Sequence, residues 1–477
     1  YQETDNRFAQ LEGRNFPNDT FRKLASAAEI SEGTSTGTGF SIVSYFARAN
    51  YGFMNKYLVS LSARIDGDSR FGEDQRYGFF PAGSVGWVVS EEPFMRDQNI
   101  FSFLKLRGSY GITGNTPTDN FPSRGLWDGA AGYANLPGIS PTQSPNPDLQ
   151  WENTEQLDIG LDWAVLEGRI SGEIDYYQKN TTDLLLDVNV PGTTGFLTQT
   201  RNVGELENQG VEVVVNARNL QGEFSWNTSI NFARNTNEIT NLQGQVIEGG
   251  FINRAVEGEP IGVFFAPEYA GVDPENGDAL YFLNTELPGG GVDRGTTNNV
   301  NDAERVVIGD PNPDFIYGMN NNFSWKGIEL NIFLQGVYGN EVYNAGGVFQ
   351  LDGFGWFDNQ DARVLDRWQQ PGDQTDIPQL RFLEGSTESS RFIEDGSYLR
   401  LKTVTLAYTL PQVLTKQFRI DRIRIYATGQ NLATFTDYEG WDPEVNADFT
   451  AGNIGLGSDF YSAPQARTII FGVNLGF

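Results

Sequence analysis

The chain has 477 residues, with no cysteine, no histidine, and 62 acidic against 33 basic residues, which gives a formal net charge of −29. Without cysteine there is no disulfide or thiol chemistry, and without histidine the commonest metal ligand and general base are absent. The acidic balance argues against a nucleic-acid partner, and 55 glycines with 13% aromatic residues favour an all-β protein.

Alternating stretches of about ten residues recur along the chain, separated by turn-forming residues. Because successive side chains of a strand point to opposite faces, such a stretch has one apolar face and one polar face. This pattern is typical of a transmembrane antiparallel β-barrel, with lipid outside and water inside. We predict about fifteen strands, at residues 41–51, 56–64, 76–89, 102–113, 155–165, 169–179, 209–219, 223–234, 246–256, 261–272, 315–325, 327–338, 398–410, 422–431 and 467–477.

The last of these segments shows the pattern most clearly. Large apolar residues occupy alternate positions up to the final residue, and small or polar residues mostly fill the positions between. An aromatic residue at the end of such a strand resembles the sorting signal of bacterial outer-membrane proteins. We therefore predict a C-terminal barrel signal at Phe471, Val473, Leu475 and Phe477.

The connections between predicted strands alternate in length. Counted back from a periplasmic C-terminus, the periplasmic links are short, and most of the opposite links are long. This assignment makes residues 1–40 an external loop and residues 41–477 the C-terminal part of a barrel. An odd number of strands does not close a barrel of the usual kind, so we expect further strands from sequence outside this chain.

Several motifs occur in a fixed order from about residue 41 to the C-terminus. They are SYFARANY (44–51), KYL (56–58), RIDGDSRFG (64–72), FPAGSVGW (80–87), LKLRGSYGITGN (104–115), NPDLQWE (146–152), IGDPNPD (308–314) and GSYLRLK (396–402). Together they resemble the barrel of SusC/RagA-like TonB-dependent outer-membrane transporters of Bacteroidetes-type bacteria. The resemblance implies the last fifteen strands of a 22-stranded barrel, a plug that this chain lacks, contact with the TonB complex, and a SusD-like lipoprotein lid.

Five aromatic residues in predicted external loops are candidates for contact with substrate or with the lid. Aromatic side chains stack on sugar rings or pack on peptide side chains, and protein interfaces also favour them. They equally serve to hold loops together. The candidates are Trp127, Trp356, Phe357, Trp368 and Trp441.

Two acidic loops have a structural and a functional interpretation. Residues 66–70 (DGDSR) predict a turn stabilised by aspartate and glycine, and residues 273–278 (DPENGD) vaguely resemble a calcium loop without its full ligand spacing. Calcium in the second loop is the one ion that we consider, and we predict no other cofactor. No nucleophile, histidine or cysteine motif stands out, so we predict that the chain is not an enzyme.

The sequence thus predicts outer-membrane import of nutrient oligomers, either glycans or peptides. Three alternatives remain: a barrel-anchored surface or adhesion protein, a soluble β-sandwich that binds carbohydrate, and an enzyme within the barrel. The last would need two carboxylates about 5–10 Å apart at a substrate-sized cleft.

Overall fold

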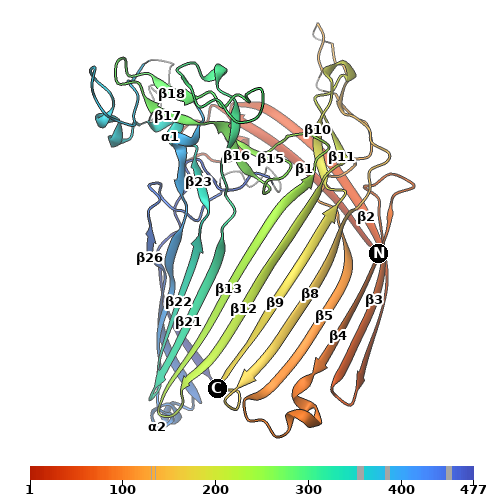
Figure 1. The fold of residues 1–477 in the computed structure, drawn as a ribbon, viewed down its shortest axis with the longest axis vertical. Coiled ribbons are helices and arrows are strands. Elements are labelled where there is room, and N and C mark those ends of the chain that lie inside the picture. Colours follow the sequence, from red (N-terminus) through yellow and green to blue (C-terminus); the bar gives the residue numbers. More distant parts are fainter. Residues whose placement is uncertain (130, 135, 352–358, 382–386, 447–453) are drawn as a thin grey trace.

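The computed structural model of residues 1–477 describes every residue except 130, 135, 352–358, 382–386 and 447–453. One curved antiparallel sheet of 14 strands forms the wall of the molecule (Figure 1). Neighbours in the sheet follow chain order, because hairpins connect them. The strands are β1 (Gln2–Arg14), β2 (Glu29–Phe53), β3 (Tyr57–Asp68), β4 (Tyr77–Val88), β5 (Phe101–Asn115), β8 (Glu152–Val165), β9 (Ile170–Thr182), β12 (Glu205–Leu220), β13 (Phe224–Asn241), β21 (Phe315–Trp325), β22 (Ile328–Tyr338), β25 (Tyr398–Thr409), β26 (Arg422–Thr436) and β28 (Thr468–Gly476).

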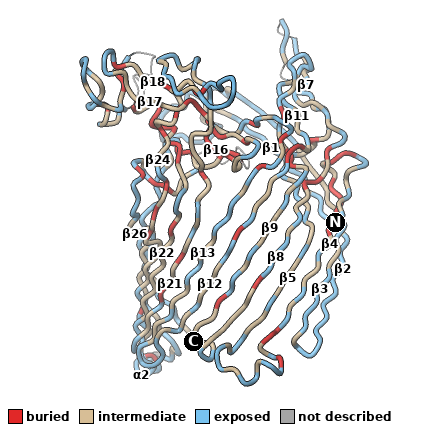
Figure 2. Tube along the Cα trace, in the orientation of Figure 1, coloured by how far each residue is buried: buried red, intermediate tan, exposed pale blue. Residues whose placement is uncertain are grey.

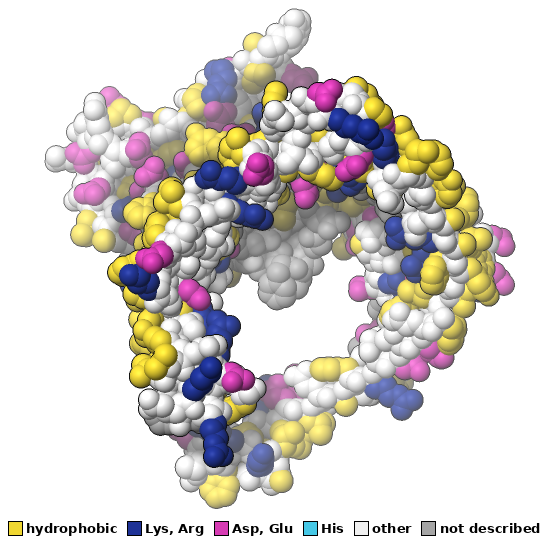
Figure 3. All heavy atoms as spheres, turned by 90° about the horizontal axis from the view of Figure 1, so that it is seen from below, with side chains coloured by type: hydrophobic (Ala, Val, Ile, Leu, Met, Phe, Trp, Pro, Cys, Tyr) yellow, Lys and Arg dark blue, Asp and Glu magenta, His cyan; other side chains and the backbone are white. Residues whose placement is uncertain are grey.

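The two faces of this sheet differ as the alternation predicts. Apolar side chains such as Leu61 and Leu406 are 60% and 54% exposed on the convex face. Seen from below in Figure 3, the wall surrounds an opening, hydrophobic side chains gather on its outer rim, and charged side chains project inward. The all-β barrel class is therefore confirmed. In the described residues no helix has the length and apolar character to cross a membrane.

The two ends of the wall carry connections of different length. At one end, which we call the short-turn end, the links include 54–56, 166–169, 221–223 and 326–327. Lys326 and Gly327 form a tight turn with φ of 46° and 87°, the left-handed backbone that tight hairpins between twisted strands favour. The opposite, long-loop end carries residues 116–151, 183–204, 242–314, 339–397 and 437–467.

Small sheets and short helices build the long-loop end. Strand β23 pairs parallel with β27, whereas the other small-sheet pairs are antiparallel. The strands are β6 (Leu126–Asp128), β7 (Ser140–Gln143), β10 (Leu185–Asn189), β11 (Thr198–Asn202), β14 (Ile247–Glu248), β15 (Asn253–Ala255), β16 (Val263–Pro267), β17 (Tyr269–Val272), β18 (Ala279–Phe282), β19 (Thr296–Thr297), β20 (Arg305–Gly309), β23 (Glu341–Asn344), β24 (Ile393–Asp395) and β27 (Ser458–Asp459).

The helices are all short and lie in the connections. The α-helices are α1 (Gly347–Gln350) and α2 (Gln412–Thr415). The 3-10 helices are η1 (Leu24–Ser26), η2 (Val89–Glu91), η3 (Pro93–Met95), η4 (Gly192–Thr194), η5 (Val300–Asp302), η6 (Ala362–Asp366), η7 (Ser390–Phe392) and η8 (Lys416–Phe418).

Two predicted wall strands are wrong. Residues 246–256 and 261–272 form β14 to β17 in small sheets at the long-loop end, and β13 pairs directly with β21 in the wall. Their apolar residues are buried among the loops instead of facing lipid: Ile252, Val263 and Phe264 are all 0% exposed. The link at 257–260 is therefore not a turn at the short-turn end.

Residues 1–40 form strands for the most part where we predict a loop, and their external location stays a prediction. Strand β1 and the first part of β2 form a hairpin, in register from Gln2 opposite Ile42 to Glu12 opposite Glu32. Residues 33–39 read GTSTGTG, a stretch with no apolar alternation. Threonine nevertheless favours extended backbone, so this strand forms without an apolar face. The apolar positions of 398–410 change phase between Leu401 and Val404, which predicts a β-bulge, and the register shift between Leu401 and Thr403 confirms it.

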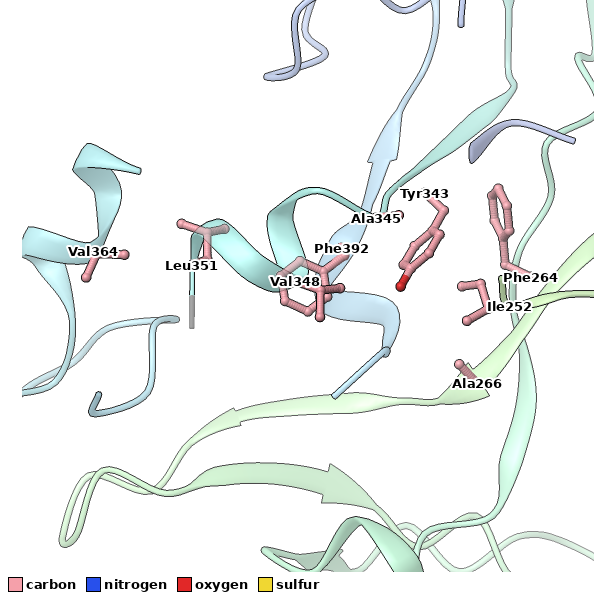
Figure 4. Close-up of a cluster of buried hydrophobic side chains, with 9 residues drawn as sticks. All are labelled: Ile252, Phe264, Ala266, Tyr343, Ala345, Val348, Leu351, Val364 and Phe392. Carbon is pink, nitrogen blue, oxygen red and sulfur yellow. The ribbon is translucent and has the colours of Figure 1, made fainter. Parts of the chain in front are cut away.

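Buried residues concentrate at the long-loop end rather than in the wall (Figure 2). Among the described residues, three separate clusters of buried hydrophobic residues form there. The largest joins residues in or next to β15, β16, β23, α1, η6 and η7 (Figure 4); its members are Ile252, Phe264, Ala266, Tyr343, Ala345, Val348, Leu351, Val364 and Phe392.

Candidate functional site: the concave wall and the loop module

The concave face of the wall carries a network of paired charges. Lys105 and Arg107 extend from β5 and contact Asp162 of β8 at 2.9 and 2.8 Å. Arg107 also donates to Asp175 of β9 at 2.6 Å and lies 3.4 Å from Asp158. The aspartates therefore line the concave wall as ion-pair partners.

Two of the sequence motifs pack against each other where the wall meets the long loops. Phe71 and Leu149 are 1% and 0% exposed, and the Gly72 amide donates to the Leu149 carbonyl at 3.2 Å. A Cβ atom on Gly72 would lie 1.7 Å from the Pro147 carbonyl oxygen, so the contact requires glycine. Trp151 completes the cluster, and its indole nitrogen donates to the Arg76 carbonyl at 2.9 Å. The motifs RIDGDSRFG and NPDLQWE thus share one structural role.

The DGDSR turn is a structural clamp. Asp68 is fully buried and accepts hydrogen bonds from the Arg70 backbone amide at 2.9 Å and from the Arg70 guanidinium. The same guanidinium donates to the carbonyl of Thr118 at 3.2 Å and to the hydroxyl of Thr116 at 2.6 Å. The turn therefore ties the β3–β4 loop to the start of the β5–β8 loop.

Three long loops meet at this end of the wall, and we call their described residues, within 242–314, 339–397 and 437–467, the loop module. The Asn253 side chain is fully buried at the junction and donates to the carbonyls of Gly262 at 2.8 Å and Leu456 at 2.7 Å. It accepts from the Ser458 hydroxyl at 3.1 Å. One amide therefore joins two loops that are about 200 residues apart in sequence.

The last loop of the module also contacts the concave wall. Arg400 of β25 is 1% exposed and pairs with Asp442 and with Glu444, the latter at 3.0 Å. Burial alone would raise the pKa of Asp442, but hydrogen bonds from Arg400 and from the amides of Gln465 and Glu444 outweigh burial and lower it. Asp442 is therefore ionised at neutral pH and forms an ion pair with Arg400.

Three of the five predicted aromatic residues lie in the described part of the chain, and their contact with substrate or lid stays a prediction. Trp127 lies in β6 and is 65% exposed, and Trp441 lies in the loop module and is 71% exposed. Trp368 packs on Gly277 and donates to the Pro274 carbonyl at 3.2 Å, which gives it a role inside the module. Trp356 and Phe357 lie outside the described residues.

Residues 273–278 form a tight turn whose last carboxylate is engaged. Asp278 lies 2.6 Å from Arg381 and accepts from the Asn298 amide at 2.8 Å. In the part of the chain that the structure describes, no group of three or more acidic side chains is arranged to hold a metal. These contacts favour the structural interpretation of the loop, and calcium binding there stays a prediction.

Sequence reasoning missed an aromatic cluster in the loop module. The ring centroids of Phe251 and Tyr461 lie 5.6 and 4.8 Å from that of Phe460, and Phe349 lies 5.8 Å from it. Phe251 and Tyr461 have φ of 43° and 53°, a backbone conformation that is unfavourable for bulky residues. No motif marks these residues, because their proximity depends on three loops meeting.

The terminal strand has the predicted alternation. Phe471, Val473, Leu475 and Phe477 are 80%, 58%, 50% and 85% exposed, as expected for side chains that face lipid. Their role as a sorting signal stays a prediction.

Comparison with known proteins identifies the family. The sequence profile of the TonB dependent receptor-like β-barrel family matches residues 2–272. TonB-dependent receptor P3 of Formosa agariphila is 35% identical over all of this chain and 50% of its own length. TonB-dependent receptor SusC of Bacteroides thetaiotaomicron is 31% identical over 96% of this chain and 46% of its own length.

The chain belongs to the SusC/RagA-like TonB-dependent receptors. The solved structure of the RagAB peptide transporter superposes on all of it with a TM-score of 0.87 and 28% identity, and 52% of that chain is covered. The soluble β-sandwich alternative is therefore wrong. The chain spans about half the length of the curated relatives that it matches. Membership of this family assigns it to the outer membrane.

Proposed function

We propose that this chain forms the passage and much of the outer mouth of an importer that moves nutrient oligomers, glycans or peptides, across the outer membrane. The single observation that carries the proposal is the pairing of an apolar convex wall with a concave wall lined by paired charges. Such a wall presents hydrocarbon to lipid and a polar path to a hydrated cargo. The short-turn end, with the C-terminus, faces the periplasm in this proposal.

The long-loop end has the character of a docking platform. Its loops are joined by buried hydrophobic clusters and by the Asn253 hydrogen bonds. They therefore present one preformed surface instead of several independent loops. We propose that this surface carries a SusD-like lipoprotein lid. A preformed surface supports that partnership, because less conformational entropy is lost when a partner binds.

Transport in this proposal draws energy from the TonB complex through a plug contributed by sequence outside this chain. The chain itself performs passage, docking and recognition, and carries out no bond chemistry. Arg107 engages the acidic residues Asp158, Asp162 and Asp175, so these carboxylates are occupied by ion pairs rather than arranged as a free acid–base pair.

The proposal is tested in the native bacterium with the full-length gene. A deletion strain is grown on a casein digest and on hydrolysed plant and algal polysaccharides as alternative sole carbon sources. We expect a growth defect on one of these nutrient classes and restoration by the full-length gene. Normal growth on both classes, with a loss of surface adhesion, would support the barrel-anchored adhesion protein instead.

The lid is tested by purification. Full-length protein extracted in mild detergent through an affinity tag should carry a surface lipoprotein in near-equal amount. Tagged protein that is folded and carries no lipoprotein would contradict the partnership.

A further inference from the structure

The loop between β26 and β28 folds back into the mouth of the passage. Arg400 lies opposite Gln335 and Thr434 in the sheet, and its neighbours Leu399 and Leu401 take the opposite, convex face. Arg400 therefore points to the concave face. It is nevertheless only 1% exposed, because the segment 438–446 covers it.

The cover is fixed by a set of charge-assisted contacts. The Arg400 guanidinium contacts one carboxylate oxygen of Asp442 and lies 3.0 Å from Glu444. Lys402, two residues further along β25, donates to the same Glu444 at 2.7 Å. Two cations of one strand thus contact two carboxylates of one loop.

Asp442 also closes the loop on itself. Its two carboxylate oxygens accept from the Glu444 amide and from the Gln465 amide, each at 2.9 Å. Gln465 lies three residues before the terminal strand, which begins at Thr468, so one carboxylate links both ends of the loop to the wall. The middle of the loop is held by the Ser458 contact with Asn253 and by the Tyr438 hydroxyl, which donates to Asp459 at 2.7 Å.

A buried ion pair of this kind specifies geometry more than it adds stability. Desolvation of the charges cancels much of their attraction, whereas removal of one partner leaves a buried charge uncompensated. The expected consequence of breaking the Arg400 contacts is release of this loop. The rest of the wall is held by backbone ladders that do not involve the Arg400 side chain.

We propose that Arg400 is a positioning residue that holds residues 438–446 as a fixed sill in the mouth, so that Trp441 is presented to cargo. Trp441 is 71% exposed although it directly precedes buried Asp442. An exposed indole on a fixed backbone makes a rigid contact surface, since little conformational entropy remains to be lost on binding. The inference rests on the proposed function in one respect only, that cargo crosses the concave side.

The sill is tested by electron–electron distance measurement on the full-length protein in detergent. This chain has no cysteine. Any cysteine elsewhere in the full-length protein is first replaced, and the substitutions W441C and F435C then provide two sites for nitroxide labels. Phe435 is the reference because it lies in β26, on the convex face, and is 64% exposed. The double-labelled protein should give one narrow distance distribution.

R400M should broaden that distribution at least twofold in width. The matched control is R424M, which breaks another concave-face pair, Arg424 with Glu329 at 2.9 Å, that holds no loop. R424M should leave the distribution narrow. A narrow distribution in R400M would overturn the proposal, as would equal broadening in R424M.

A second variant covers failure of R400M to fold, which is scored by the heat-dependent gel shift of folded barrels. D442N keeps Arg400 and removes the charge that anchors both ends of the loop, so it should also broaden the distribution. If the distance distribution stays narrow in D442N, the hydrophobic contacts of the module hold the sill, and the assignment of this role to Arg400 fails. None of these distances depends on transport, so they separate failure of this inference from failure of the proposed function.

Discussion

The wall and the loop module are built on opposite principles, although one continuous chain forms both. In the wall, large side chains such as Leu61 and Phe471 are 60% and 80% exposed, and backbone ladders hold the strands. In the module, Leu242 and Phe264 are both 0% exposed, as in the core of a soluble protein. The wall depends on lipid to cover its apolar face, whereas the module covers its own.

This difference means that equal mutations have unequal costs in the two regions. A side chain removed from the convex wall leaves a space that lipid fills, whereas one removed from the module leaves a cavity that the surrounding residues fill only in part. The predictions below set matched pairs of residues against this expectation, from the largest expected effect to the smallest.

Leu242→Ala should cost about 2–5 kcal/mol of local stability, the usual range for a buried leucine. Leu242 is 0% exposed in the cluster that joins β10, β13 and the module. Leu406→Ala on the convex wall, where the leucine is 54% exposed, should cost less than about 1 kcal/mol. Hydrogen exchange of the β14 and β15 amides measures the cost of Leu242→Ala, and hydrogen exchange of the β25 amides measures the cost of Leu406→Ala. Equal costs would mean that the wall is packed as tightly as the module.

Gly72→Ala should cost about 1–3 kcal/mol, because the new methyl group would collide with the Pro147 carbonyl oxygen and force backbone to move. The matched control is Gly192→Ala in the β10–β11 loop, where an added Cβ meets nothing within 4 Å. Protease cleavage within residues 116–151 of full-length protein reports the loosening. If cleavage is no faster in Gly72→Ala than in the control, the β3–β4 loop and residues 146–152 accommodate the added methyl group by moving together, and the contact does not require glycine.

The same division explains which parts of the fold the sequence alone predicts. In a lipid-facing strand every second side chain contacts lipid and is therefore apolar. This alternation is visible in the sequence of segments such as 467–477. The strands at 246–256 and 261–272 also alternate, but their apolar residues meet other loops. Alternation alone does not distinguish lipid from a protein neighbour, and that ambiguity produced both wrong strands.

The candidate site was less predictable for a related reason. Trp441 is visible as an aromatic residue in a long loop, but nothing in the sequence around it identifies Arg400 as its anchor. The two residues lie 41 positions apart, and the contact depends on the loop folding inward. The clamp at Arg70 was predictable as a turn, because both partners lie in one motif.

Two carboxylates of the module should respond to pH in opposite ways. Burial raises the pKa of Glu394, whereas the Arg400 contact and two amides lower the pKa of Asp442. An acid with a raised folded-state pKa loses stabilisation as pH rises from its unfolded pKa through its folded pKa. An acid with a lowered pKa gives stabilisation that is complete above its unfolded pKa and lost as pH falls through the folded value.

Acidification from pH 7 to pH 5 should therefore strengthen the protection of the β24 amides, which flank Glu394, and leave the Asp442 contacts intact. Hydrogen exchange corrected for its intrinsic pH dependence measures this. The variant E394Q should abolish the gain, since glutamine does not titrate. A loss of protection between pH 7 and 5 that persists in E394Q would place the controlling group elsewhere.

The smallest effect on the folded protein should come from Phe477→Ser. The phenylalanine is 85% exposed, so its removal should change stability by less than about 0.5 kcal/mol. If the terminal strand carries a sorting signal, the amount of folded protein in the outer membrane should nevertheless fall severalfold. Val413→Ser in α2 is the matched control, because Val413 is 78% exposed at the same end of the wall. Equal amounts of the two variants in the membrane would show that the last aromatic residue serves the wall only, and that assembly reads some other feature of the strand.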